Sequence, residues 1–154
     1  MRITKRSNLA LRVLMFCGVN NDRLVTKHDI AKKCRSSENH LGQVVNQLAQ
    51  NGLLDTVRGR GGGIRLGRQP SDIQIGQVFR LMEGKPQASE CFADVDFTCP
   101  LVAACRLKPA ISAAVDAFYD TLDNICLSDL IDGNEQLENI LCLDMPVQCE
   151  TRAA

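Results

Sequence analysis

The chain has 154 residues, 45% of them hydrophobic and 23% charged, which is the composition of an ordinary globular protein with one main core. Its longest apolar runs are far shorter than the roughly 20 residues that cross a bilayer, so we expect no membrane contact. The net charge of zero combines 13 Lys and Arg against 4 Asp and Glu in residues 1–68 with 5 against 14 in residues 69–154, which predicts that the first half attracts a polyanion.

Two helices are predicted near the N-terminus. Ser7 or Asn8 can cap the first helix, because a side-chain oxygen accepts a free backbone N–H of the opening turn, and this helix should end near Gly18. Thr26 can cap a second, shorter helix, and Asp29 three residues later favours the positive end of the helix dipole. Apolar residues recur on one face of each helix, at Leu9, Val13, Leu14 and Cys17 and then at Ile30 and Ala31.

A third helix and a β-hairpin come next. Ser36 or Ser37 begins the helix, and residues 51–52 end it in a left-handed turn. The run Arg-Gly-Arg-Gly-Gly-Gly at 58–63 then separates two short apolar segments, which predicts a hairpin with arginines at an exposed tip. Three helices followed by a basic hairpin define a winged helix-turn-helix domain, to which we assign residues 1–83. The apolar face of the third helix consists of Leu41, Val44, Val45 and Leu48.

The remaining residues divide into a helix, a loop, a long helix and a tail. A helical pattern at 75–83 closes the first domain, and residues 84–106 form a cysteine-containing loop with no regular period. Residues 107–131 carry an apolar stripe too long for the surface of one small chain, so we expect a dimerisation helix; burial within one subunit is the alternative. Residues 132–154 are expected to be an acidic, partly disordered tail with a short helix at 136–143. The expected fold class is mainly α with a small β-hairpin.

The third helix and the hairpin carry side chains that suit DNA. Asn and Gln can form paired hydrogen bonds with adenine, and the first turns of a recognition helix enter the major groove. Arginines on a glycine-rich tip can reach phosphates or a narrow minor groove. Each signal alone also has a structural explanation, since polar residues line most exposed helices and arginine makes a turn soluble. The predicted DNA-binding residues are Lys27, His28, Ser37, Asn39, His40, Gln43, Arg58, Arg60 and Gly61.

Three of the eight cysteines share the irregular loop, and the chain shows no export signal, so we do not expect disulfides. Cys91, Cys99 and Cys105 are separated by seven and five residues, whereas structural zinc sites use pairs two to four residues apart. Thiolates at wider spacing suit an iron–sulfur cluster, and three of them leave one iron open to a small-molecule signal. Unligated core cysteines or a redox thiol switch are the alternatives. We expect core positions for Cys17, Cys34 and Cys126 and assign no role to Cys142 and Cys149.

Four stretches resemble the Rrf-two superfamily of bacterial repressors: MRITKRSNLALRVLMF, SSENHLGQVVNQLAQNGLL, TVRGRGGGIRL and ECFADVDFTCPLVAACRLK. The similarity covers about residues 1–131 and is greatest for the nitric-oxide-sensing NsrR branch, followed by the iron-regulator RirA branch and the IscR branch. The resemblance implies a homodimer with one iron–sulfur cluster per subunit, of the 4Fe-4S type. It also implies that the dimer binds a palindromic operator in double-stranded DNA while the cluster is intact and releases it when nitric oxide attacks the cluster.

The resemblance assigns the cluster to Cys91, Cys99 and Cys105, and it matches the predicted helix and wing residues to the DNA-reading positions of the family. At two positions this sequence differs from the family pattern, and both concern the fourth ligand of the cluster. Some members supply an aspartate from the partner's N-terminal region, and the matching position here is Asn8, so the fourth ligand stays open, with the region near Asn8 of the partner subunit as a candidate. Lys108 replaces the histidine of the IscR branch, which argues against a two-iron site of that kind.

We interpret the chain as a cytoplasmic DNA-binding repressor and not as an enzyme. The cluster loop would set the spacing between two recognition helices, each of which reads one half of the operator. An iron-responsive regulator with the same cluster, a thiol or zinc repressor, and a redox or electron-transfer protein are the alternatives. A redox or electron-transfer protein does not need a basic N-terminal half. The alternative explanation of the uneven charge is that it has no function. The glycine run leads into a second strand, so it does not present a helix N-terminus to a nucleotide phosphate.

Overall fold

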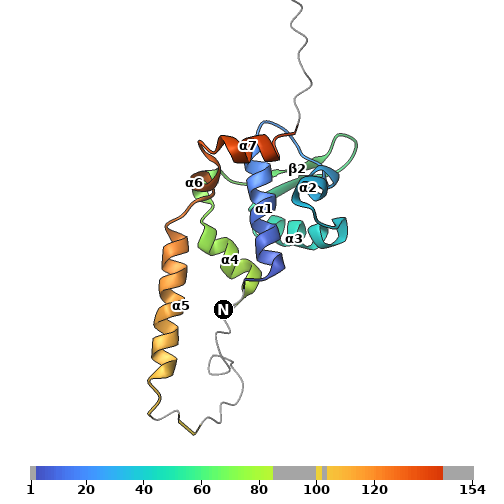
Figure 1. Ribbon diagram of the computed structural model, residues 1–154. Helices are drawn as coiled ribbons and strands as arrows, with labels where there is room; N and C mark the ends of the chain where they lie inside the picture. Colours follow the sequence, from blue (N-terminus) through green and yellow to red (C-terminus); the bar gives the residue numbers. More distant parts are fainter. Residues whose placement is uncertain (1–2, 85–99, 102–103, 144–154) are drawn as a thin grey trace, which may run out of the picture.

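The computed structural model of the protein describes residues 3–84, 100–101 and 104–143. Its N-terminal part is three helices followed by an antiparallel hairpin, the arrangement of a winged helix-turn-helix (Figure 1). None of the helices in these described ranges has the length and apolar character that a bilayer span requires. The elements of this part are α1 (Lys5–Val19), α2 (Lys27–Cys34), α3 (Glu38–Gln50), β1 (Leu54–Val57) and β2 (Gly63–Leu66).

The first helix is capped one turn earlier than predicted. Thr4 is the N-cap of α1, and its hydroxyl accepts the backbone N–H of Ser7 at 3.3 Å. The expected caps Ser7 and Asn8 are therefore wrong. Ser7 is buried because its hydroxyl donates to the carboxylate of Glu83, which follows 76 residues later in the chain. A contact between such distant residues leaves no local pattern in the sequence.

The caps of the next two helices are confirmed. Thr26 and Asp29 form a reciprocal capping box at α2, in which the Thr26 hydroxyl accepts the Asp29 N–H and the Asp29 carboxylate accepts the Thr26 N–H. Ser37 caps α3 by accepting the backbone N–H of His40 at 3.4 Å. Gly52 follows α3 with φ of 68°, a left-handed conformation that glycine adopts without a steric penalty. Local side-chain chemistry thus fixes where α2 and α3 begin and where α3 stops.

The hairpin forms the wing of the domain. β1 pairs with β2 so that Leu54 faces Leu66 and Val57 faces Gly63, and residues 58–62 make the tip. Gly59 at the tip has φ of 101°, which explains the glycine-rich turn. The predicted hairpin is confirmed, and its inner residues join the core.

One apolar core holds the helices and the hairpin together. In α1, α2 and α3 the faces that the sequence marks as apolar are buried, and Cys17 and Cys34 lie in the core as expected, whereas Cys126, also expected there, is half-buried. Fully buried side chains come from the three helices, β1 and the connecting segments, and β2 adds the nearly buried Ile64 and Leu66; the fully buried ones include Val13, Leu14, Phe16, Val25, Ile30, Leu41, Val44, Leu48, Leu53 and Leu54. At roughly 1.5–3 kcal/mol per buried side chain, this core is the main source of the domain's stability.

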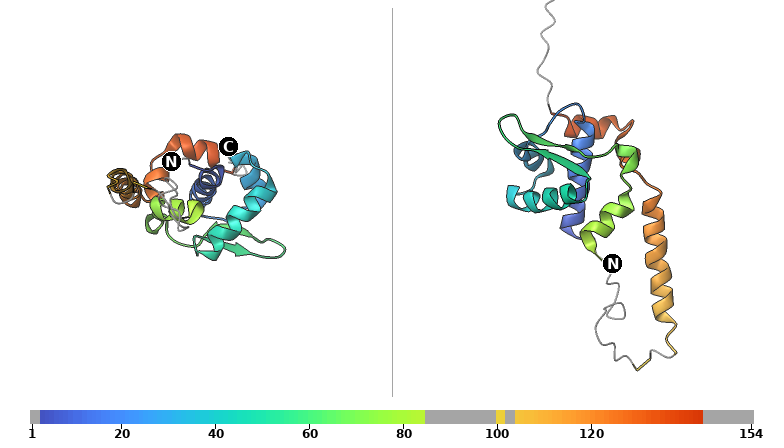
Figure 2. Two further views of the ribbon diagram at one scale, coloured as in Figure 1. Left: turned by 90° about the horizontal axis from the view of Figure 1, so that it is seen from below. Right: turned by 180° about the vertical axis from the view of Figure 1, so that it is seen from behind.

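The second half contains one helix that stands apart and several that pack on the domain. The helix α5 (Leu107–Asp123) extends away from the domain and meets it near its C-terminal end, as Figures 1 and 2 show. The other elements surround α1. They are the 3-10 turn η1 (Pro70–Asp72) and the helices α4 (Ile75–Glu83), α6 (Leu127–Ile131) and α7 (Glu135–Leu141).

The segment expected to form one dimerisation helix, residues 107–131, is divided. α5 ends at Asp123, and α6 begins four residues later at Leu127. Two backbone hydrogen bonds fix the break, from Ile75 N–H to Ile125 O at 2.9 Å and from Leu127 N–H to Ile73 O at 2.9 Å. The apolar residues after the break therefore fill the core beside α1, while those before it lie on α5.

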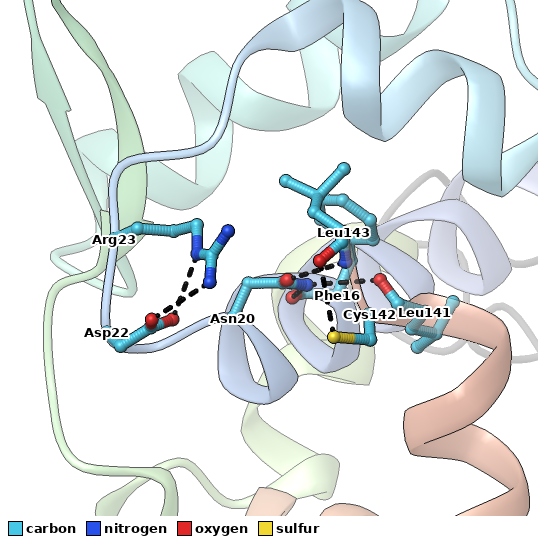
Figure 3. Close-up of polar contacts among 7 residues, drawn as sticks. All are labelled: Phe16, Asn20, Asp22, Arg23, Leu141, Cys142 and Leu143. Atoms are coloured by element: carbon cyan, nitrogen blue, oxygen red, sulfur yellow. Dashed lines mark hydrogen bonds and ion pairs between the residues drawn. The ribbon is translucent and has the colours of Figure 1, made fainter. Parts of the chain in front are cut away.

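The tail begins with a docked helix. Asn20 at the end of α1 is 2% exposed, and its amide nitrogen donates to the carbonyls of Phe16 at 2.8 Å and Leu141 at 3.1 Å (Figure 3). Its amide oxygen accepts the N–H of Leu143 at 3.0 Å. Every polar group of this buried amide is therefore satisfied, and the bonds hold the end of α7 against α1.

Lys33 of α2 adds a second tie to the same helix end. Its ammonium group donates to the carbonyls of Ile140 at 3.1 Å and Cys142 at 2.9 Å, which are among the carbonyls that a helix C-terminus leaves without a partner. The short helix expected at 136–143 is confirmed with bounds of Glu135–Leu141. The predicted disorder of the last residues, and Cys149, lie outside the described part of the chain.

Candidate nucleic-acid interface and cysteine loop

The outward face of α3 presents the predicted base-reading residues. Asn39, His40 and Gln43 are exposed on the first two turns, because the opposite face is occupied by the buried apolar stripe. Ser37 lies at the same end, where its hydroxyl caps the helix. The structure thus brings these four residues together at one helix end, with the amide and imidazole groups free to meet the edges of bases.

Two predicted residues of α2 lie beside that helix end. Lys27 and His28 are both exposed on the first turn of α2. The ring of His28 lies 3.3 Å from the carboxylate of Glu38, the one acidic residue in the first turn of α3. A carboxylate at this position repels phosphates, and the imidazole beside it offsets that repulsion when it is protonated.

The wing carries the remaining predicted residues at its tip. Arg58, Arg60 and Gly61 are exposed, and within the described ranges no carboxylate forms an ion pair with either arginine. Arg65, lower on the wing, lies 3.5 Å from Asp55. The two tip guanidinium groups are therefore available to bind phosphates or a minor groove.

A hollow of about 350 Å³ separates α3 from the wing. Its polar lining comes from three elements, the start of α2, the outward face of α3 and the base of the wing tip. The lining includes Thr26, Lys27, Gly42, Asn46, Arg58 and Gly62.

The cysteine loop is described only at its end. Cys91 and Cys99 lie outside the described residues, so their expected role is not tested. Cys105 is half-buried and stands two residues before α5, whose first turn has no side-chain cap. The positive end of the α5 helix dipole lies at that turn and favours negative charge nearby, such as a thiolate or an anionic cluster. Among the residues that the structure describes, no three His, Cys, Asp or Glu side chains gather as a metal site.

Asn8 is exposed on α1 and borders a larger hollow of about 810 Å³. This hollow runs from the start of α1 to the start of α3, where Ser37 and His40 also line it. Its cationic lining residues are Lys5, Arg12 and Arg35. The expected ligand position is thus on a basic, accessible surface that adjoins the recognition helix.

The last turn of α4 connects the start of the cysteine loop to two helices. The Glu83 carboxylate accepts the backbone N–H of Thr4 at 2.8 Å and the hydroxyl of Ser7. Partial burial opposes ionisation of Glu83, but these hydrogen bonds outweigh it and lower its pKa below the ordinary value. Gln47 of α3 donates from its side-chain amide to the carbonyl of Leu81 at 2.7 Å. Sequence patterns gave no sign of either contact, since each joins residues more than 30 positions apart.

A compact polar and aromatic contact joins α4 to the C-terminal end of α5. Arg80 donates two hydrogen bonds to the Asp123 carboxylate, at 2.6 and 2.7 Å, and its guanidinium lies 4.4 Å from the ring centre of Tyr119. The hydrogen bonds from Arg80 lower the pKa of Asp123. Phe79 and Phe118 meet edge to face at 5.9 Å beside this pair. The direction in which α5 leaves the domain is therefore set by a few contacts at one end.

The two core cysteines have no features of a metal ligand. Burial, and secondarily the neighbouring Cys34, raises the pKa of Cys17 to about 12. Burial also raises the pKa of Cys34. Both thiols therefore stay protonated at neutral pH, and a protonated thiol neither binds metal nor reacts readily.

Comparisons with known proteins agree with this arrangement. The family model Rrf2, described as "Iron-dependent Transcriptional regulator", matches residues 3–133. The chain is 38% identical to Protein aau3 of Rhizobium meliloti (strain 1021) over the full length of both. It is 39% identical to the HTH-type transcriptional regulator NsrR of Geobacillus kaustophilus (strain HTA426), over 92% of this chain and 97% of that protein.

A solved structure is similar as well. IscR of T. potens matches with a TM-score of 0.65 and 26% identity, over 84% of this chain and 85% of that one. The predicted fold class and the predicted superfamily are thereby confirmed. Because the family and the NsrR relative are described as transcriptional regulators, the prediction of a regulator and not an enzyme is confirmed too.

Proposed function

The chain belongs to the Rrf2 family of iron-dependent transcriptional regulators, and from this premise we propose that it is a dimeric repressor that senses nitric oxide through an iron–sulfur cluster. The observation that carries the proposal is the 39% identity with an NsrR regulator over 92% of the chain. Such a repressor acts on operator DNA in the cytoplasm. The exposed end of α3 and the wing tip support its DNA-binding part.

Operator DNA is bound by the first turns of α3 and by the wing. Asn39 and Gln43 provide amide groups that bind base edges in the major groove. Arg58 and Arg60 provide positive charge that binds phosphates or the adjacent minor groove. Because α3 and the wing belong to one rigid core, both contacts are made at once by one subunit. A palindromic site is then matched by two subunits related by two-fold symmetry, with their recognition helices about one DNA turn apart.

The cluster is held by Cys91, Cys99 and Cys105, one cluster of the 4Fe-4S type in each subunit. Cys105 fits this role, since it is accessible and lies beside the uncapped N-terminus of α5. The fourth position is near Asn8 of the partner subunit, whose basic hollow complements an anionic thiolate-bound group. When bound, the cluster supplies iron that reacts with nitric oxide, and a site with three thiolates leaves one iron accessible.

Two subunits associate through α5. This helix has 17 residues, of which Tyr119 alone is buried, while its N-terminal apolar residue Leu107 is 62% exposed. The apolar positions Ile111, Val115 and Phe118 continue the same stripe with partial exposure. A stripe of this kind is stabilised by a second copy of the helix, because association removes it from water.

The last turn of α4 couples the cysteine loop to the recognition helix. Glu83 connects the start of the loop to α1, and Gln47 connects the same turn to α3. A loop held by its ligands keeps both contacts in place, whereas a released loop allows that turn to move, which changes the orientation of α3. The arrangement therefore couples occupancy of the cysteines to the spacing of the two recognition helices.

An iron-responsive regulator with the same ligands is the second candidate. The observation that favours it is the description of the family as iron-dependent. In this alternative, loss of iron and not attack by nitric oxide releases the DNA.

One experiment tests the proposal and separates the candidates. Protein purified without oxygen is titrated with nitric oxide while its visible absorption and its binding to a labelled operator duplex are followed. We expect both signals to fall together, and Cys99→Ala to lack both from the start, whereas Cys142→Ala keeps both. A colourless Cys99→Ala variant with tight, specific DNA binding would reject control by the cluster. Release by an iron chelator without a response to nitric oxide would favour the iron-responsive alternative.

A further inference from the structure

Gly42 occupies an unusual position in the middle of the recognition helix. It lies between Leu41 and Gln43 in α3, where glycine is less favourable than alanine because it loses more backbone freedom on folding. Its φ is not in the left-handed region, so the backbone does not require glycine there. A Cβ atom at this position would have one near neighbour, the ammonium nitrogen of Lys27 at 3.6 Å, which is an ordinary contact.

Two other glycines in helices are required by packing, because a Cβ atom at either position would collide with a neighbouring side chain. At Gly76 an added Cβ would collide with the carboxylate of Asp123, and at Gly18 it would approach Ile131 to 2.8 Å. Folding explains both of these glycines. It does not explain Gly42, so the space beside Gly42 has to serve something other than packing within the subunit.

That space is the hollow between α3 and the wing. Lys27 and Arg58 line it and no acidic residue does, while Val45, Ala49, Val57 and Ile64 contribute apolar surface. Asn46 and Thr26 add polar groups that can donate hydrogen bonds. A hollow with two cationic residues, neutral donors, no carboxylate and some apolar side chains is complementary to an anionic group that carries an apolar part, such as a sugar–phosphate unit.

We propose that this hollow binds one sugar–phosphate unit of the DNA strand that passes between the recognition helix and the wing. Gly42 leaves room for this unit because it has no side chain. The inference rests on the proposed DNA-binding function and identifies a residue of that interface which sequence patterns did not indicate. Lys27 is the main phosphate ligand, because its ammonium lies directly over Gly42. A side chain at position 42 would occupy the place of the phosphate or displace Lys27.

The test compares Gly42→Met and Gly42→Ala with Gln50→Ala, an exposed change on the same helix away from the hollow. Binding to an operator duplex and to an unrelated duplex is measured by fluorescence anisotropy at several salt concentrations. We expect Gly42→Met to weaken binding to both duplexes by about tenfold, since phosphates carry no sequence information. Gly42→Ala should melt about 3 °C higher than the wild type, because alanine favours the helix. Gln50→Ala should bind as the wild type does.

A double-mutant cycle with Lys27→Gln shows whether both residues act at the same phosphate. Lys27→Gln should reduce the slope of log affinity against log salt by about 1. Gly42→Met should then cost much less affinity in the Lys27→Gln background than in the wild type, because the phosphate contact is already lost. Additive losses, or a folded Gly42→Met dimer with wild-type affinity, would overturn the proposal. If the wild type itself binds neither duplex, the proposed function fails, and this inference fails with it.

Discussion

The winged-helix body and the helix α5 differ in how much of their apolar surface the subunit itself covers. The body, which we define as residues 3–84 together with α6 and α7, buries apolar side chains from every helix and from both strands. In α5 one side chain, Tyr119, is buried, although the helix is longer than any in the body. The difference teaches that the body is built around a core of its own, whereas α5 leaves most of its apolar surface open for the proposed contact with a second subunit.

The same comparison explains how α5 can act on the body. Its C-terminal end is fixed by Arg80 and the aromatic residues around it, and its N-terminal end adjoins the cysteine loop. In the proposed repressor, a change at the far end of α5 would reach the body through this joint. Four mutational tests break or sharpen this comparison, and they follow in order of expected effect.

The largest effect is expected for a truncation in the core of the body. Leu14 on α1 is fully buried, so Leu14→Ala should lower the free energy of unfolding by about 3 kcal/mol through lost burial and the cavity left behind. The exposed Ile140 on α7 provides the control, and Ile140→Ala should cost less than about 0.5 kcal/mol. Urea denaturation followed by circular dichroism measures both. Equal losses for the two variants would contradict the assignment of the core.

The second substitution places a charge on the apolar stripe of α5. Ile111→Glu should weaken dimerisation by about 100-fold, since a carboxylate would be buried without a partner between two helices. Ala113→Glu, on the opposite face of α5 and exposed, should leave the dimer intact. Analytical ultracentrifugation measures the subunit affinity of each variant, and circular dichroism checks the fold. A dimer that tolerates Ile111→Glu would show that α5 is not the interface.

The joint between α4 and α5 is expected to contribute less. Arg80 and Asp123 are both partly exposed, so water screens their ion pair in spite of the good geometry. A double-mutant cycle of Arg80→Ala and Asp123→Ala should give a coupling of about 0.5 kcal/mol in the free energy of unfolding. Hydrogen exchange should also become faster in the last turn of α5. A coupling of zero with unchanged exchange would mean that the aromatic contacts alone fix this joint.

The smallest effect concerns the pH dependence of the Glu83 contacts. The pKa of Glu83 is lowered in the folded protein, so its stabilising effect is present above the pKa of an unfolded glutamate and is lost as the pH falls through the folded value. Glu83→Gln should cost about 0.3 kcal/mol at neutral pH. The difference from the wild type should shrink below about pH 4, as thermal unfolding over a pH series would reveal. If the stability difference between Glu83→Gln and the wild type stayed constant down to pH 2, Glu83 would not act through its ionised carboxylate.

The parts of the fold that local chemistry determines were predictable. Thr26 and Ser37 cap their helices as expected, Gly52 stops α3, and the glycine run produces the wing. In each case the signal and its consequence lie within a few residues, where capping and turn preferences act. The family resemblance then assigned a role to the wing and to the recognition helix.

Contacts between distant residues were not predictable in the same way. Asn20 carries no pattern that marks it, yet its buried amide holds the end of α7, and Ser7 was expected to cap α1 but bonds to Glu83. The helical period also continued past Asp123, because α6 buries apolar residues with similar spacing after a break made by backbone pairing. Sequence periodicity reports which residues are apolar, and it does not report which surface covers them.

The backbone pairing at 73–75 and 125–127 has a consequence for the integrity of the polypeptide. The chain that follows α4 returns to the body at this pairing through α5. A single cleavage between Gly84 and Leu107 would therefore give two fragments that still fit together, since Leu127, Ile131 and Leu141 of the second fragment fill the surface of α1 in the first. Produced as two separate polypeptides, the fragments should reassemble by complementation, with the new ends at the cysteine loop.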